Sequence, residues 1–144
     1  MFVFPIGSII AETALNPNVN ILFIIGKWFV FWVVGIRLFT AGIRQIIQPK
    51  FTAKDILGLK ERESWILVRE LGFTNTALGV LGILSIFFRE WIMPSALAGS
   101  IFLGLTGINH LVAKNKNIHA KTAMISNILI SIVLIIYFVL SLLK

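Results

Sequence analysis

Four long apolar stretches limit the fold of this chain more than any other feature of its sequence. They cover about residues 20–48, 65–88, 94–113 and 122–143. A helix needs roughly 20 apolar residues to cross the hydrocarbon core of a bilayer, where every backbone N–H and C=O must find a partner within the protein. The sequence therefore predicts an all-α membrane protein, folded as a four-transmembrane-helix antiparallel bundle in a single membrane domain over residues 1–144.

The composition excludes several classes of soluble protein. Hydrophobic residues make up 58% of the chain and charged residues 13%, whereas a soluble domain has about 45–50% and 25%. Such a chain has too few polar groups to cover its own surface, so lipid must solvate much of it. The chain contains no cysteine, and hence no disulfide, thiolate nucleophile or cysteine metal site. We exclude a secreted disulfide scaffold, a disordered regulator and an ordinary cytosolic enzyme.

Prolines and charged residues mark the ends of the predicted spans. Pro49 ends the first span, because proline lacks a backbone N–H and restricts the residue before it. Residues 89–91, Arg-Glu-Trp, separate the second and third spans, and Pro94 suits the first turn of a helix. The polar residues 114–121 precede the fourth span.

Two shorter segments flank the first span. Residues 1–18 are apolar but too short to span a bilayer, and they lack the basic start of a signal peptide. We predict a short N-terminal interfacial segment, packed against the end of the bundle and followed by a turn at residues 16–18. Residues 49–64 predict an amphipathic cytoplasmic loop with a short helix on the membrane surface, and an irregular polar loop is the alternative.

The distribution of lysine and arginine predicts the orientation. The connections between the first and second spans and between the third and fourth spans, together with the end of the first span, carry eight basic residues. The side of the bundle with the chain termini carries three. The positive-inside rule then places a multi-pass protein in the cell membrane, with both termini outside and both long loops in the cytoplasm. The basic loops also attract anionic lipids, so the net charge of +7 requires no nucleic-acid partner. The eight residues are Arg44, Lys50, Lys54, Lys60, Arg62, Lys114, Lys116 and Lys121, and the three are Lys27, Arg89 and Lys144.

Polar side chains inside the spans are the main hint of function, because a charged group in lipid needs a partner or water. Alternating helix directions place the ends of the first and third spans beside the starts of the second and fourth. Polar residues therefore gather in the cytoplasmic half of the bundle, and the outer half holds almost nothing comparable. We predict these ligand-binding residues: Arg37, Arg44, Glu70, Asn75, Asn109, His110 and Asn127.

Glu70 is the one acidic residue well inside a predicted span, which makes it the natural counter-ion for Arg44 or Arg37. A buried ion pair between the first two spans and a charged pocket open to the cytoplasm both fit this placement. Glu70 and Asn75 are about 140° apart around a helix, so we expect them to face different neighbours.

His110 has two interpretations, a proton carrier or a hydrogen-bonding group between helices. The chain has one other histidine and no paired spacing of metal ligands, so we predict no metal and no cofactor. Gly72, Gly79 and Gly82 lie on one side of the second span and predict close helix packing. They are also compatible with a homodimer.

The sequence resembles a family of small prokaryotic membrane proteins of unknown function over roughly residues 66–140. The resemblance rests on Glu-Leu-Gly-Phe-Thr-Asn at 70–75, the glycines at 79 and 82, Ala-Gly-Ser-Ile-Phe at 98–102 and Gly-Ile-Asn-His at 107–110. The chain is also loosely similar to DoxX-like four-helix membrane proteins. The resemblance implies a compact four-helix membrane bundle in which Glu70, Asn75 and His110 matter, and it implies no activity.

Three functions fit these features. The first is binding or transport of a small anionic or amphiphilic ligand against Arg37 and Arg44, since arginine pairs bidentately with carboxylate or phosphate. No internal repeat is evident, so transport would need a dimer. The second is a structural or accessory subunit of a membrane complex. The third is an intramembrane lipid- or quinone-directed enzyme with Glu70 and His110 as acid and base.

Overall fold

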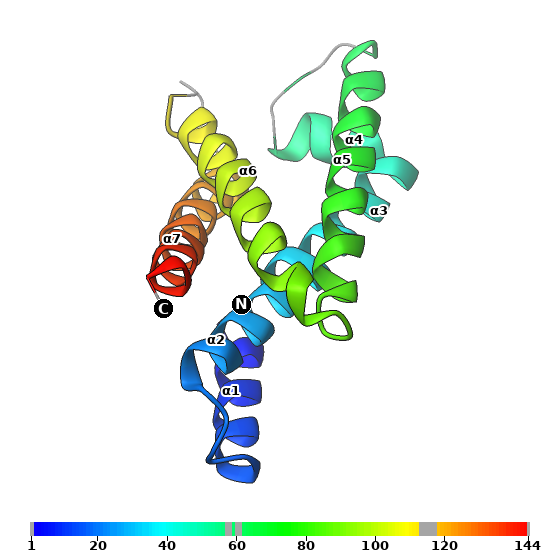
Figure 1. The fold of residues 1–144 in the computed structure, drawn as a ribbon. Helices are drawn as coiled ribbons and strands as arrows, with labels where there is room; N and C mark the ends of the chain where they lie inside the picture. Colours follow the sequence, from blue (N-terminus) through cyan, green and yellow to red (C-terminus); the bar gives the residue numbers. More distant parts are fainter. Residues whose placement is uncertain (1, 57–58, 60–61, 113–117, 144) are drawn as a thin grey trace.

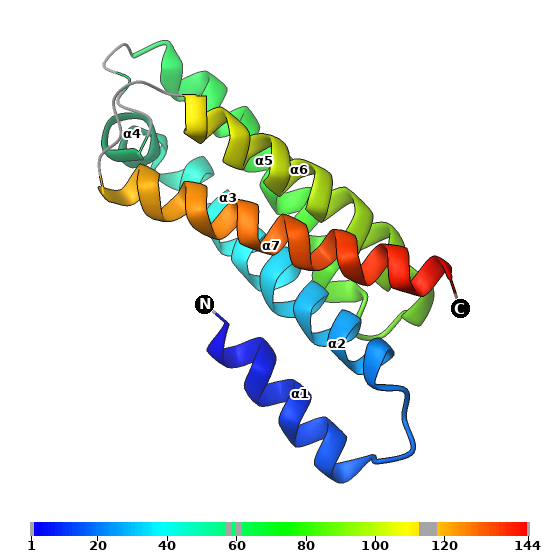
Figure 2. The same ribbon diagram turned by 90° about the vertical axis from the view of Figure 1, so that its left-hand side faces the viewer.

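The computed structural model describes residues 2–56, 59, 62–112 and 118–143, and every element within these residues is helical. Four described helical segments are long and apolar enough to cross a membrane: Ile21–Ile47, Ser64–Leu84, Arg89–Val112 and Ala120–Leu142. The prediction of an all-helical chain with four membrane-length helices is confirmed. The four segments run along the long axis of the molecule in Figure 2, and Figure 1 shows two pairs of helices that diverge toward one end.

The first long helix runs without a break from Ile21 to Ile47, but its hydrogen-bonding pattern changes in the middle. Asn20 caps its start, because the Asn20 side chain accepts a hydrogen bond from the Leu22 N–H. In the middle segment the turn is wider, and the Arg37 N–H donates to the Trp32 carbonyl five residues earlier. The three parts are α2 (Ile21–Phe29), the π-helical η1 (Val30–Ile36) and α3 (Arg37–Ile47).

The other long helices are α5 (Ser64–Leu84), α6 (Ile92–Val112) and α7 (Ile118–Leu142). The breaks predicted at Pro49 and at residues 89–91 are confirmed. The helix α3 ends at Ile47, two residues before Pro49. A single 3₁₀ turn, η3 (Arg89–Trp91), separates α5 from α6, and Pro94 lies in the first turn of α6. Of the polar segment predicted before the fourth span, residues 114–117 lie outside the described residues, and residues 118–121 already belong to α7. We call the end where α3 and α6 finish and α5 and α7 begin the loop end, and η3 lies at the opposite end.

Glycines let the first long helix and α5 touch backbone to backbone. A Cβ atom on Gly82 would lie 2.4 Å from the backbone nitrogen of Gly35, and one on Gly79 would lie 2.4 Å from that of Phe39. The paired numbers rise along one helix and fall along the other, so these two helices run in opposite directions. Gly72 meets the same helix nearer the loop end. The close packing predicted from the three α5 glycines is confirmed.

The helices α6 and α7 form a second closely packed pair (Figure 1). The Ser131 hydroxyl donates to the Ser100 carbonyl at 2.8 Å, and Gly107 lies against Ile128. Apolar side chains fill the space between the two pairs from the middle of the helices toward the η3 end. They include Val30, Val33, Val34, Ile92, Ala96, Ile130, Leu134 and Tyr137.

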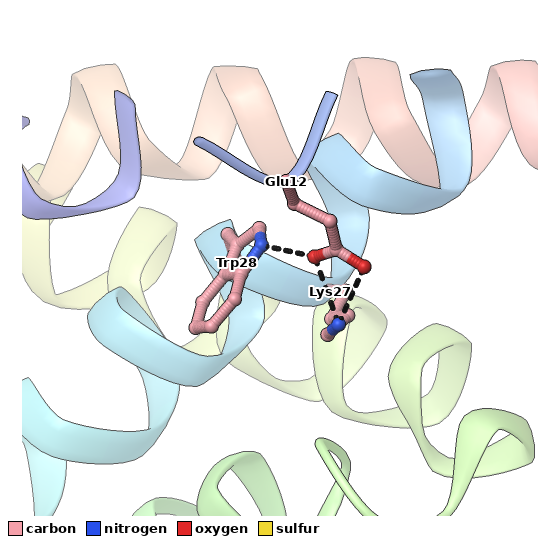
Figure 3. A network of polar contacts seen from close by, with 3 residues as sticks. All are labelled: Glu12, Lys27 and Trp28. Atoms are coloured by element: carbon pink, nitrogen blue, oxygen red, sulfur yellow. Dashed lines mark hydrogen bonds and ion pairs between the residues drawn. The ribbon is translucent and has the colours of Figure 1, made fainter. Parts of the chain in front are cut away.

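The turn at residues 16–18 folds the preceding helix α1 (Val3–Leu15) back along α2 and η1 (Figure 2). The Lys27 ammonium donates to both carboxylate oxygens of Glu12 at 2.8 Å, and the Trp28 indole N–H donates to one of them (Figure 3). The Trp32 indole N–H donates to the Ser8 hydroxyl at 3.0 Å. The prediction that this segment packs against the end of the bundle is wrong, because these bonds hold it along the side of α2.

The residues after the first long helix form two short helical turns, α4 (Pro49–Phe51) and η2 (Thr52–Ile56). Thr52 and Ala53 are buried, and η2 contacts both α5 and α7. This part of the predicted amphipathic loop therefore packs into the loop end. Its position on a membrane surface stays a prediction. Lys60, Lys114 and Lys116 of the predicted basic loops lie outside the described residues.

We predict that Gly82→Ala lowers the thermal unfolding temperature of the full chain in detergent, because the new methyl group meets the Gly35 backbone and not a movable side chain. Overpacking of this kind destabilises a protein by about 1–3 kcal/mol. Gly7→Ala is the matched control, since nothing lies within 4 Å of its Cβ position. Equal unfolding temperatures for the two variants would contradict the backbone contact.

Candidate functional site

A cavity of about 220 Å³ lies at the loop end, lined by residues of α3, α5, α6 and α7 and by Thr52 of η2. Its polar lining also includes Gln45 and Thr106, and its apolar lining includes Leu38, Leu71 and Leu103. Four of the seven residues predicted for a ligand site share this cavity. They are Arg37, Asn75, His110 and Asn127.

Arg37 connects three of the helices around the cavity. Its Nη2 donates to the Asn127 side-chain oxygen at 2.6 Å and to the Ser126 hydroxyl at 3.1 Å. The Asn127 amide nitrogen in turn donates to the Thr106 hydroxyl at 3.1 Å. No acidic residue is among the described residues that line the cavity. Among the described lining residues, amide and hydroxyl dipoles face the guanidinium charge in place of a carboxylate.

A second polar contact crosses the cavity wall between α3 and α5. The Asn75 amide nitrogen donates to the Gln45 side-chain oxygen at 2.7 Å, and both residues are buried. Two atoms of the lining residues remain buried without a hydrogen-bond partner, Arg37 Nη1 and Asn75 Oδ1. An unpaired buried polar group costs about 1–3 kcal/mol, so this wall retains one donor and one acceptor that an additional polar group can satisfy.

The predicted pairing of Glu70 with Arg37 or Arg44 is wrong. The Glu70 side chain is exposed, and the described ion pair of the chain joins Glu12 to Lys27 instead. The helix α5 turns Leu71 and Asn75 toward the cavity. Around the helix axis, Glu70 lies about 100° from Leu71 and about 140° from Asn75. The expectation that Glu70 and Asn75 face different neighbours is confirmed.

Arg44 and Asn109 also lie outside the cavity lining. The Arg44 guanidinium lies 3.8 Å from the centroid of the Phe51 ring, a cation–π contact. Arg44 shares a helical stripe with Arg37, but it is two turns nearer the end of α3 and is exposed. Asn109 is exposed on α6. The cavity thus joins only part of the predicted site.

His110 is half-buried in the cavity wall. Glu70 is exposed and does not line the cavity, so the acid and base of the enzyme hypothesis are not brought together there. Within the part of the chain that the structure describes, no three histidine, aspartate or glutamate side chains lie close enough to hold a metal ion.

Sequence reasoning missed three polar residues of the cavity. Gln45 follows Leu38 and Ala41 at helical spacing, and Thr106 lies one turn before His110. Helical spacing from the predicted site residue His110 indicates Thr106. Leu38 and Ala41 are not predicted site residues, so the sequence carries no such signal for Gln45. Thr52 comes after a proline, where no regular period connects it to the spans, and the sequence carries no comparable signal for it.

A polar network near the opposite end was also missed, so the prediction that the other half holds almost nothing comparable is wrong. Glu12 and Lys27 form their ion pair with only 15% and 19% of their side-chain surfaces exposed. The signal was Lys27 itself, because a cation within an apolar stretch needs a partner. Glu12 supplies it from a segment that the sequence does not place beside α2.

Comparison with known proteins identifies one match. A family described as "Family of unknown function (DUF6790)" matches residues 1–143. No curated protein and no solved structure matches the chain. The looser resemblance to DoxX-like proteins stays a prediction.

We predict that Asn127→Leu lowers the thermal unfolding temperature of the full chain in detergent, because it removes the closest acceptor of Arg37 and leaves a buried charge with fewer partners. The expected loss is about 1–3 kcal/mol or more. Asn127→Asp keeps an acceptor at this position and adds a counter-ion, so we expect it to be less damaging than Asn127→Leu.

Asn109→Leu is the matched control for this experiment, since Asn109 is exposed on α6. A loss of stability in Asn109→Leu as large as that in Asn127→Leu would show that the Arg37 contacts do not stabilise the fold.

Proposed function

Since the chain belongs to this family, whose function is unknown, we propose from its own geometry that it binds a small anionic or amphiphilic ligand in the loop-end cavity. The observation that carries the proposal is the environment of Arg37. This side chain lines the cavity, faces neutral hydrogen-bond acceptors, and keeps Nη1 buried without a partner.

An anion suits this environment for two reasons. A charge removed from water is costly unless a partner of opposite sign compensates it, and the described lining of the cavity contains no carboxylate. A guanidinium also presents several N–H donors that match the oxygens of a carboxylate or phosphate. A small rotation of the Arg37 side chain would direct Nη1 to such a ligand.

The remaining walls favour an anion attached to an apolar body. Leu38, Leu71, Phe102 and Leu103 line the cavity beside the polar groups. An amphiphile can place its charged group against Arg37 and its hydrocarbon against these side chains. The unpaired Asn75 Oδ1 offers an acceptor for a hydroxyl of the ligand or for an ordered water.

Binding fits the structure better than transport. The buried side chains of Val30, Val33, Val34, Ile130 and Leu134 fill the space between the helices from their middle toward the η3 end. A path from the cavity across the molecule would require this packing to open. We therefore restrict the proposal to binding, with transport as the weaker form of the same hypothesis.

The two alternatives have less support. An accessory subunit would present small residues to its partner, but nine of the ten glycines with a described environment already lie against other parts of this chain. An intramembrane enzyme would need Glu70 and His110 close together, and Glu70 is exposed outside the cavity that His110 lines. The four long apolar helices favour a lipid bilayer as the medium around the protein.

We also propose that the four long helices form an antiparallel transmembrane bundle in the cell membrane, with the loop end in the cytoplasm and both termini outside. The uneven distribution of lysine and arginine supports this orientation. The chain has no cysteine, so single introduced cysteines can report it. We predict that, in intact bacterial cells, a membrane-impermeant maleimide labels Glu90→Cys and does not label Lys121→Cys.

Opening the cells before labelling is the control, and both variants should then react. Labelling of Lys121→Cys in intact cells, without labelling of Glu90→Cys, would reverse the proposed orientation.

For the ligand, we predict that native mass spectrometry of the gently solubilised full chain detects a bound anion that is lost in Arg37→Gln. We also predict that hexanoate or inorganic phosphate raises the unfolding temperature of the wild type, since a ligand that binds the folded state stabilises it. Neutral 1-hexanol should have a smaller effect than hexanoate, because it cannot pair with the guanidinium.

Arg89→Gln is the matched control, since it removes an exposed arginine at the opposite end of the molecule. A wild type with neither a co-purified anion nor an Arg37-dependent response to hexanoate or phosphate would overturn the proposal. Loss of the anion in both variants would assign the effect to net charge and not to the cavity.

A further inference from the structure

A second cavity at the loop end is lined by basic residues from two sides. It has a volume of about 670 Å³ and lies between the turns α4 and η2 and the first turns of α5. Lys50 and Lys54 come from the turns, and Arg69 comes from α5. All three side chains are exposed, and no acidic residue is among the described residues of the lining. The cavity is therefore a concentrated site of positive charge.

Trp65 also lines this basic cavity. It lies in the lining one turn before Arg69, and its indole nitrogen is buried without a hydrogen-bond partner. Tryptophan is also common at the level of lipid headgroups, where its ring is in the apolar region and its N–H reaches polar groups. Three cations around one cavity suit a ligand that is rich in acceptor oxygens, and the Trp65 ring suits the level of lipid headgroups.

An apolar groove of about 410 Å³ continues from the basic cavity along α3. Phe39, Ile43 and Ile47 line the groove, and Ile47 and Gln48 belong to both hollows. The side chain of Ile47 is 71% exposed. The groove therefore offers an open hydrocarbon surface that begins at a cluster of cations. The charged cavity matches the headgroup of a phospholipid, and the adjoining apolar groove matches one of its acyl chains.

We propose that this surface binds one anionic phospholipid of the inner leaflet. Its phosphate lies among Lys50, Lys54 and Arg69, and one acyl chain follows the groove past Ile47. The site differs from the Arg37 cavity in both lining and position, and it depends on the proposed function only through the placement of the loop end at a membrane surface. Arg44 also lines the groove, where its guanidinium lies over the Phe51 ring, and it adds positive charge near the headgroup.

The test uses the purified full chain in mild detergent and two short-chain lipids as probes, dioctanoyl phosphatidylglycerol and dioctanoyl phosphatidylcholine. We expect native mass spectrometry to show one tightly held phosphatidylglycerol and weaker binding of phosphatidylcholine. Inorganic phosphate at the same concentration should not compete, because it lacks the acyl chain. Competition by phosphate alone would assign the cavity to a free anion and overturn the lipid proposal.

The decisive variant is Lys50→Gln with Arg69→Gln, and the matched control is Lys121→Gln with Arg89→Gln. Each pair lowers the formal net charge by two, from +7 to +5, and all four residues are exposed. We expect the first pair to weaken phosphatidylglycerol binding roughly thirtyfold, since each basic residue near anionic lipid contributes about fivefold to affinity. The control pair should bind as the wild type does.

Two outcomes separate this site from the Arg37 cavity. Arg37→Gln should leave phosphatidylglycerol binding unchanged, and Lys50→Gln with Arg69→Gln should leave the response to hexanoate unchanged. Equal weakening of lipid binding by the two charge-matched pairs would show a diffuse electrostatic effect and overturn the proposal. Unfolding temperatures measured without lipid identify a variant that has lost its fold. If Lys50→Gln with Arg69→Gln has lost its fold, the single variant Lys54→Gln replaces this pair.

Discussion

Backbone contact between the first long helix and α5 positions most of the structure. In a lipid environment apolar side chains gain little by leaving the solvent, so helices associate through close packing and shared hydrogen bonds. At Gly35 and Gly82 the two backbones approach so closely that a single added methyl group would overlap the partner. This approach sets the distance between α3 and α5 at the loop end, where the Gln45 and Asn75 side chains meet at 2.7 Å.

The polar contacts at the loop end then depend on this spacing. The Gln45–Asn75 bond closes one wall of the cavity, and the bonds from Arg37 through Asn127 to Thr106 close the other. A chain of neutral amides and hydroxyls links the helices without neutralising the arginine. In contrast, Lys27 near the opposite end has a full carboxylate partner in Glu12. Among the described residues, a carboxylate pairs with partly buried Lys27, whereas neutral groups face partly buried Arg37. The ligand proposal therefore rests on Arg37 and not on Lys27.

The features that follow from one helix alone could be predicted from the sequence. Apolar length defines the four spans, Pro49 and Pro94 mark helix ends, and the α5 glycines mark a packed face. The alternating helix directions also predict that Arg37, Asn75, His110 and Asn127 gather at one end, but the pairing of particular side chains across two elements could not be predicted. Glu70 is exposed because its helix turns Leu71 and Asn75 inward, and the choice between these faces depends on where α3 packs.

The local path of the chain between elements could be predicted only in part. The turn at residues 16–18 is predicted from the sequence and is confirmed, but no pattern in either segment indicates that α1 lies along the side of α2, where Glu12 reaches Lys27. The wide turn of η1 just before Arg37 also has no marker such as a proline. Since a π turn changes how far the following side chains are rotated around the axis, the direction of Arg37 could be derived only from the fold.

One short element joins the two proposed sites. Thr52, at the start of η2, lines the Arg37 cavity, whereas Lys54, two residues later, lines the basic cavity. Between them Ala53 is fully buried, so it fixes the turn against the helices. A phospholipid held by Lys54 would therefore restrain the same turn that closes the inner cavity. Two ligands that both order one element favour each other's binding, so the position of η2 would couple the two proposed sites if both are occupied.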